Sequence, residues 1–108
     1  MLKEVRLKAI AHITGGGFFE NIPRVIPNGL AAKINIGSWN APPIFKIVKR
    51  LSGMTDTEMF SSLNMGIGLV MMISKGDSAE VLSALEAAGE ANASVIGEVV
   101  RGEGIILT

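Results

Sequence analysis

The sequence predicts an α+β domain in which helices and a mixed β-sheet pack as α/β/α layers. β-like runs, alternating or rich in branched side chains, take turns with amphipathic helical runs along the chain. Apolar residues make up 48% of the sequence but aromatic residues only 5%, so aliphatic side chains must fill the core. At 108 residues the chain fits a single domain, residues 1–108, with one core.

The first strand and helix flank a cluster of glycines. Residues 9–13 form a short β-like run that stops at Thr14 and the three glycines after it. Residues 18–26 then carry apolar side chains at helical spacing. Pro23 is expected in the first turns of this helix, where its missing N–H costs least.

A second strand and helix follow. Residues 30–36 alternate in polarity and predict a half-buried strand. A helix is expected from the capping residue Asn40 to Gly53, which ends it. Its expected apolar stripe consists of Ile44, Ile47, Val48 and Leu51.

The middle of the chain predicts a short helix and a buried strand. Residues 55–58 have the spacing of a capping box, and the helix that they begin should place Met59 and Phe60 against the core. Residues 64–73 are almost continuously apolar. Such a run is typical of a central strand covered on both faces.

The C-terminal part predicts a helix and two strands. A second capping-box pattern at residues 77–80 begins a helix that Gly89 ends. Residues 93–101 and 104–108 flank a tight turn and predict a terminal hairpin. The expected order is β-α-β-α-(α)-β-α-β-β, which is partly ferredoxin-like.

Charge and composition exclude several functions. Ten basic residues balance ten acidic ones, so no net field attracts nucleic acid or an anionic membrane, and neither is an expected partner. The chain has no cysteine and a single histidine, so no metal site of thiolates or several histidines is expected. No apolar stretch approaches the roughly 20 residues of a membrane span. We expect a cytoplasmic protein.

The glycine turn and His12 are the candidate site. Thr14, Gly15, Gly16 and Gly17 follow a strand and precede a helix, an arrangement whose backbone N–H groups can approach a phosphate. A sharp corner that needs glycine only for its backbone geometry is the alternative. His12, at the end of its strand, is either a proton-transferring group or a hydrogen-bonded structural residue.

One long string resembles a known family. Residues 8–27 read KAIAHITGGGFFENIPRVIP, which is similar to the signature of phosphoribosylformylglycinamidine cyclo-ligase, also called aminoimidazole ribonucleotide (AIR) synthetase. Trp39, residues 43–45, residues 58–60 and the run at residues 64–69 recur at that family's spacing. The resemblance covers most of the chain.

The resemblance implies that the chain is the C-terminal domain of an enzyme of purine synthesis. It implies ATP-dependent ring closure of formylglycinamidine ribonucleotide, with ATP and Mg²⁺ as cofactors and a homodimer as the full-length form. In the family an N-terminal domain supplies the nucleotide-binding and metal-binding residues and forms the active-site cleft with the C-terminal domain. None of that domain is present here, so His12 and residues 14–17 should form only one wall of the site, and the fragment alone should be inactive.

Two other functions remain open from the sequence. One is another ATP-using enzyme of the same superfamily, such as a selenophosphate synthetase or a thiamine-monophosphate kinase. The Asn-Ile-Pro-Arg continuation at residues 21–24 argues against these. The other is a non-catalytic domain that binds a small ligand.

Overall fold

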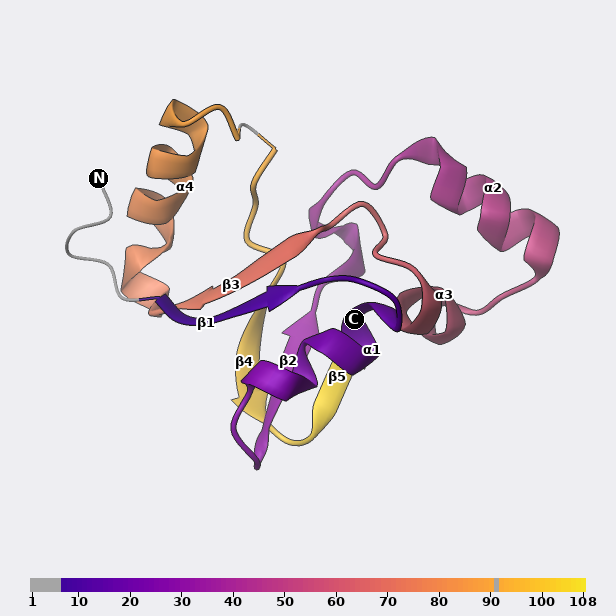
Figure 1. Cartoon of the computed structure of the whole chain (residues 1–108), viewed down its shortest axis with the longest axis horizontal. Coiled ribbons are helices and arrows are strands. Elements are labelled where there is room, and N and C mark those ends of the chain that lie inside the picture. Colours follow the sequence, from indigo (N-terminus) through magenta and orange to yellow (C-terminus); the bar gives the residue numbers. More distant parts are fainter. Residues whose placement is uncertain (1–6, 91) are drawn as a thin grey trace.

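The computed structural model describes residues 7–90 and 92–108, and they form the predicted α+β fold (Figure 1). Helices and strands follow one another in the expected order. They are β1 (Leu7–His12), α1 (Gly17–Asn21), β2 (Leu30–Ile34), α2 (Pro43–Ser52), α3 (Asp56–Ser62), β3 (Leu69–Ile73), α4 (Ser78–Ala87), β4 (Gly97–Arg101) and β5 (Gly104–Leu107). Short 3₁₀ helices at η1 (Pro23–Val25), η2 (Ile36–Ser38) and η3 (Lys75–Asp77) lie between them.

The described strands form two sheets. β1 and β3 pair antiparallel as a two-stranded ribbon. The other sheet is mixed, because β2 lies between β4, to which it is antiparallel, and β5, to which it is parallel (Figure 1).

The predicted terminal hairpin is therefore wrong. Both of its strands form, but β2 separates them, so their link must cross about two strand spacings, or ~10 Å. Three Cα–Cα steps of about 3.8 Å are long enough for this crossing. Gly102 fixes the link over the start of β2 by donating its backbone N–H to the carbonyl of Gly29 at 3.1 Å. Turn residues show where the chain reverses but not which strand lies between the two arms.

The prediction of a central strand at residues 64–73 is also wrong. The strand begins only at Leu69, and in the described part of the chain β3 pairs with β1 alone. Val70 faces the core, whereas the side chain of Leu69 is exposed. The apolar character of this run is real, but β3 belongs to a two-stranded ribbon, and Val70 is its one buried residue while Met71, Met72 and Ile73 are only partly buried.

Prolines move two predicted helix boundaries. Pro23 has no N–H to donate to the preceding turn, so the helix expected over residues 18–26 divides into α1 and the 3₁₀ turn η1. Likewise α2 begins at Pro43 rather than near Asn40, with Pro42 as its first flanking residue. The residue before a proline is disfavoured in the helical region, which places the start of α2 at Pro43.

One of the two predicted capping boxes forms. At α3 the side chain of Thr55 accepts from the backbone N–H of Glu58 at 3.2 Å, and Glu58 accepts from the N–H of Thr55 at 3.0 Å. At α4 the Asp77 side chain makes no capping bond. Asp77 closes the preceding 3₁₀ turn η3, so its backbone is helical rather than extended as a capping residue requires.

The core lies between the two sheets, α1 and α3. Its buried members are Ala11, Ile13, Phe18, Ile22, Ala32, Ile34, Met59, Phe60 and Val70. Phe18 packs edge-to-face on Phe60 at 5.0 Å between ring centroids and is stacked with Trp39 at 6.0 Å. The Trp39 indole N–H donates to the carbonyl of Met65 at 3.1 Å. Trp39 thus closes an apolar seam within this chain.

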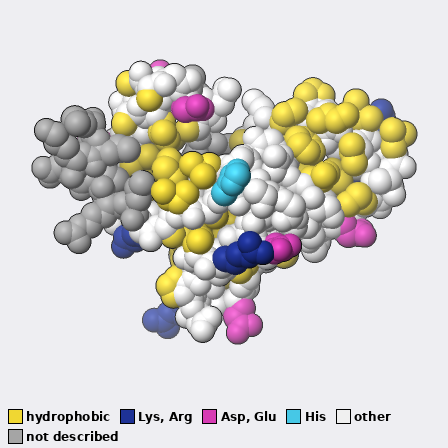
Figure 2. All heavy atoms as spheres, viewed as in Figure 1, with side chains coloured by type: hydrophobic (Ala, Val, Ile, Leu, Met, Phe, Trp, Pro, Cys, Tyr) yellow, Lys and Arg dark blue, Asp and Glu magenta, His cyan; other side chains and the backbone are white. Residues whose placement is uncertain are grey.

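α2 and α4 extend from this core on opposite sides of the molecule (Figure 1). None of the residues of α2 is buried, and on its predicted apolar stripe Ile44 is 55% exposed and Leu51 80% exposed. Figure 2 shows the resulting hydrophobic surface over this helix. The helix α2 is amphipathic as predicted, but most of its apolar stripe faces solvent in the described structure.

Candidate functional site

The turn after β1 is a tight corner held by one buried side chain. Gly17 donates its N–H to the Thr14 carbonyl at 3.0 Å, and Gly16 and Gly17 have positive φ angles of 90° and 59°. Asn21, which is 6% exposed, donates to the carbonyls of Thr14, Gly15 and Gly17 at 3.3, 3.4 and 2.8 Å. Its amide oxygen also accepts from the Thr14 hydroxyl at 3.3 Å. Asn21 therefore fixes the turn and has little capacity left for a ligand.

The three glycines of the turn have different reasons to be glycine. A Cβ at Gly17 would overlap the Phe60 carbonyl oxygen and lie 2.8 Å from that of Leu63, so Gly17 lets α1 approach α3. Gly16 has a left-handed backbone, and the Glu20 side chain occupies the position of its missing Cβ. Gly15 has no positive φ, and a Cβ there would meet nothing within 4 Å. The fold explains Gly16 and Gly17 but not Gly15.

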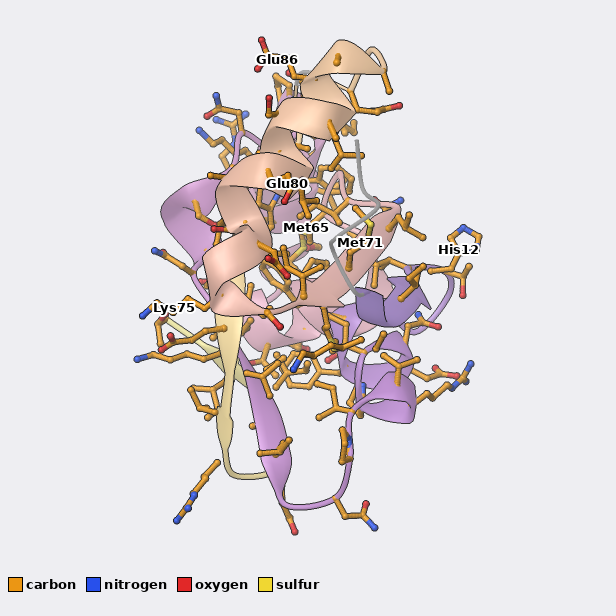
Figure 3. The ribbon with its side chains drawn as sticks, turned by 90° about the vertical axis from the view of Figure 1, so that its left-hand side faces the viewer. His12, Met65, Met71, Lys75, Glu80 and Glu86 are labelled. Atoms are coloured by element: carbon orange, nitrogen blue, oxygen red, sulfur yellow. The ribbon has the colours of Figure 1, made fainter. Side chains whose placement is uncertain are left out.

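His12 lies at the end of β1 opposite Leu69, and its side chain points away from the body of the chain (Figures 2 and 3). The ring is exposed and therefore accessible to a ligand. Because Ile13 and Ala11 on either side face the core, the alternation of the strand directs His12 outward. The exposed ring of His12 is therefore not part of the buried core.

An open pocket of about 300 Å³ lies beside His12. It is lined by Ile10, Ala11, His12, Thr14, Asn21, Arg24 and Val25. The structure thus brings His12 and Thr14 together at one pocket, as the sequence suggested. Gly15, Gly16 and Gly17 do not line it.

Arg24 is the pocket residue that sequence reasoning missed. Its guanidinium donates to the Glu20 carboxylate at 2.6 Å, and both side chains are more than half exposed. The four-residue spacing of Glu20 and Arg24 on a predicted helix was the available signal. The pair forms although the helix divides between them, at Pro23.

The chemistry available at this pocket is limited to anion binding and proton transfer. A guanidinium and an imidazole can hold a phosphate or carboxylate, and an imidazole can also transfer a proton. Among residues 7–90 and 92–108, no group of three or more His, Cys, Asp or Glu side chains could hold a metal ion. No helix within these same residues is long and apolar enough to cross a membrane.

The fold and the site define an α+β domain with an open pocket, lined by both polar and apolar side chains, at the end of a strand. The statistical model of the family described as "AIR synthase related protein, C-terminal domain" matches residues 1–108. The chain therefore belongs to this family.

Proteins similar to the chain include phosphoribosylformylglycinamidine cyclo-ligases. The chain is 49% identical over 104 residues to that of Caldicellulosiruptor saccharolyticus, covering 96% of this chain and 30% of the relative. It is 48% identical over 104 residues to that of Bacillus velezensis, again covering 96% of this chain and 30% of the relative. The chain thus spans about a third of the length of these relatives and corresponds to their C-terminal region.

A solved structure confirms the fold. The crystal structure of E. coli HypE matches with a TM-score of 0.72 at 25% sequence identity, covering 98% of this chain and 33% of that chain. The sequence identity to the cyclo-ligases is nearly twice as high.

Proposed function

We propose that this chain is the C-terminal part of a phosphoribosylformylglycinamidine cyclo-ligase and supplies one wall of its active site. The observation that carries the proposal is the open pocket with His12, Thr14 and Arg24 beside the glycine turn. The chain that forms this pocket matches cyclo-ligases over nearly its whole length. The enzyme would close the imidazole ring of a purine precursor at the expense of ATP.

In the proposed reaction, ATP activates the substrate for ring closure. The γ-phosphoryl group of ATP is transferred to the formyl oxygen of formylglycinamidine ribonucleotide. A nitrogen of the substrate attacks the activated carbon, the C–O bond breaks, and ADP, phosphate, AIR and a proton are released. An exposed imidazole at the pocket is suited to accept that proton or to hydrogen-bond the leaving phosphate. His12 is our candidate for this role.

We assign the binding of Mg²⁺ to the rest of the enzyme and not to this chain. Phosphoryl transfer requires cations around the transferred phosphate, usually Mg²⁺ held by carboxylates. The described residues contain no cluster of three or more His, Cys, Asp or Glu side chains that could hold the ion, and we assign no step in this chain to Mg²⁺. The open shape of the pocket is consistent with a second wall contributed by the remaining two-thirds of the enzyme.

A chimaeric enzyme tests the proposal. The corresponding C-terminal region of the B. velezensis cyclo-ligase would be replaced by residues 1–108, which share 48% identity with it over 104 residues. The chimaera should form AIR and release ADP in equal amounts when given ribonucleotide and ATP. A chimaera that folds normally but forms no AIR would contradict the proposal.

A further inference from the structure

The Glu20 carboxylate lies between the glycine turn and Arg24. An ideal Cβ on Gly16 would coincide with the Glu20 carboxylate, so this group covers the turn. One carboxylate oxygen accepts from the Arg24 guanidinium at 2.6 Å. The negatively charged Glu20 carboxylate thus already lies between the glycine turn and the Arg24 guanidinium.

This ion pair is exposed, but its backbone is fixed. The Arg24 and Glu20 side chains retain 64% and 54% of their exposure, and exposed pairs of this kind contribute little to stability. Ile22, between them in the chain, is completely buried, and Asn21 ties the turn to α1. The two side chains can therefore separate at low cost without moving the corner.

Arg24 is also the permanent cation of the pocket. The chain has no net charge, so any anion must be held by a local group. The Asn21 amide N–H groups donate to backbone carbonyls, so His12 and Arg24 are the pocket side chains whose nitrogen atoms can donate to an anion. The guanidinium carries a positive charge, and its fork of N–H groups matches two oxygens of a phosphate.

We propose that Arg24 binds a phosphate group of the ligand and that the Glu20 carboxylate holds its place in the free protein. On binding, a phosphate displaces Glu20 from Arg24, and Glu20 turns to solvent. This inference rests on the proposed function, which places a ribonucleotide monophosphate and ATP at the same site. Either can supply the phosphate, so the test must separate the two.

Steady-state kinetics of the chimaera provide that test. In Arg24→Gln we expect the KM for one phosphate-bearing substrate to rise about 10- to 100-fold, as for the loss of a charge-assisted hydrogen bond. A rise for the ribonucleotide alone assigns its monophosphate, and a rise for ATP alone assigns the nucleotide phosphates. Arg24→Lys, which keeps the charge but not the fork, should lie between Arg24→Gln and the parent. Arg101→Gln, an exposed arginine on β4 away from the pocket, is the matched control and should not change either KM.

Glu20→Gln tests the placeholder. Removing the competing carboxylate should lower the affected KM about two- to fivefold, because an exposed ion pair is weak. The same substitution should have no effect in the Arg24→Gln background, where there is no cation left to compete for. Circular dichroism should show parent-like folding for all these variants, since both side chains are exposed.

The outcomes separate the two proposals. If the parent chimaera makes no AIR, the proposed function fails. If it makes AIR but Arg24→Gln leaves both KM values within twofold of the parent, only the assignment of Arg24 is overturned. A KM that rises in Glu20→Gln as it does in Arg24→Gln would overturn the placeholder role, because Glu20 would then support binding instead of competing with it.

Discussion

Gly17→Ala should destabilise the protein far more than Gly15→Ala, although the two glycines are only two residues apart. An alanine at Gly17 needs a left-handed backbone, which costs an L-residue about 1–2 kcal/mol. Its Cβ would also overlap the Phe60 carbonyl, and the resulting strain between α1 and α3 is typically about 1–3 kcal/mol. The sum is about 2–5 kcal/mol. At Gly15 a Cβ meets open space, so a change within about 0.5 kcal/mol is expected.

Urea denaturation measures both effects. Trp39 stacks on Phe18 of α1, so its fluorescence reports the loss of packing at this corner, and far-UV circular dichroism reports the secondary structure. In thermal scans the Gly17 variant should melt roughly 8–20 °C below the parent, taking about 4 °C for each kcal/mol in a domain of this size. If the two variants had equal stability, the assignment of Gly17 to the contact between α1 and α3 would be wrong.

Four further predictions concern the rest of the fold and the binding of ATP. Thr55→Ala should cost about 1 kcal/mol of unfolding free energy by removing the cap of α3. Hydrogen bonds from the Thr55 backbone N–H, and then with its side chain, lower the pKa of Glu58 from its ordinary value of 4.5. The Glu58 carboxylate therefore stabilises the fold above pH 4.5, and this contribution is lost as the pH falls through the lower pKa of the folded state. Glu58→Gln should remove that part of the loss of stability in acid. Leu51→Ala should change stability by less than about 0.5 kcal/mol because Leu51 is exposed, whereas Phe60→Ala should cost about 3–5 kcal/mol; similar losses would mean that α2 packs differently. Isothermal titration of residues 1–108 with ATP and Mg²⁺ should show little or no binding. Submicromolar affinity would contradict the proposal that the rest of the enzyme binds the nucleotide and the metal.

The elements were predictable because each has a local signal. The apolar spacing of α2, the capping box of α3 and the short β-like run of β1 all depend on neighbours within a few residues. The exact boundaries depended on proline chemistry that was visible in the sequence, and Pro23 and Pro43 explain both errors.

Sheet pairing was not predictable in the same way. That β2 lies between β4 and β5 depends on contacts about 70 residues apart, and no local pattern encodes them. The exposed face of β3 was misjudged for a related reason. An apolar run indicates a face suited to burial, but it does not show whether the covering element belongs to these residues.

The candidate site was predictable in part. His12 and Thr14 were identified from their place at the end of a strand, and the structure places both at the pocket. Arg24 was not, because the side chain reaches the pocket from a 3₁₀ turn that the predicted continuous helix did not contain. The role of Asn21 required the folded turn, since its three carbonyl partners converge only there.

Turnover of the chimaera with His12→Gln tests most directly whether this chain forms a wall of the active site. Glutamine keeps a polar side chain of similar reach but cannot transfer a proton at neutral pH. Because His12 is exposed, the substitution should leave the unfolding free energy within about 0.5 kcal/mol of the parent. The account predicts that kcat for AIR formation falls about 100-fold or more, the usual contribution of a proton-transferring side chain. An unchanged kcat in a normally folded variant would contradict it.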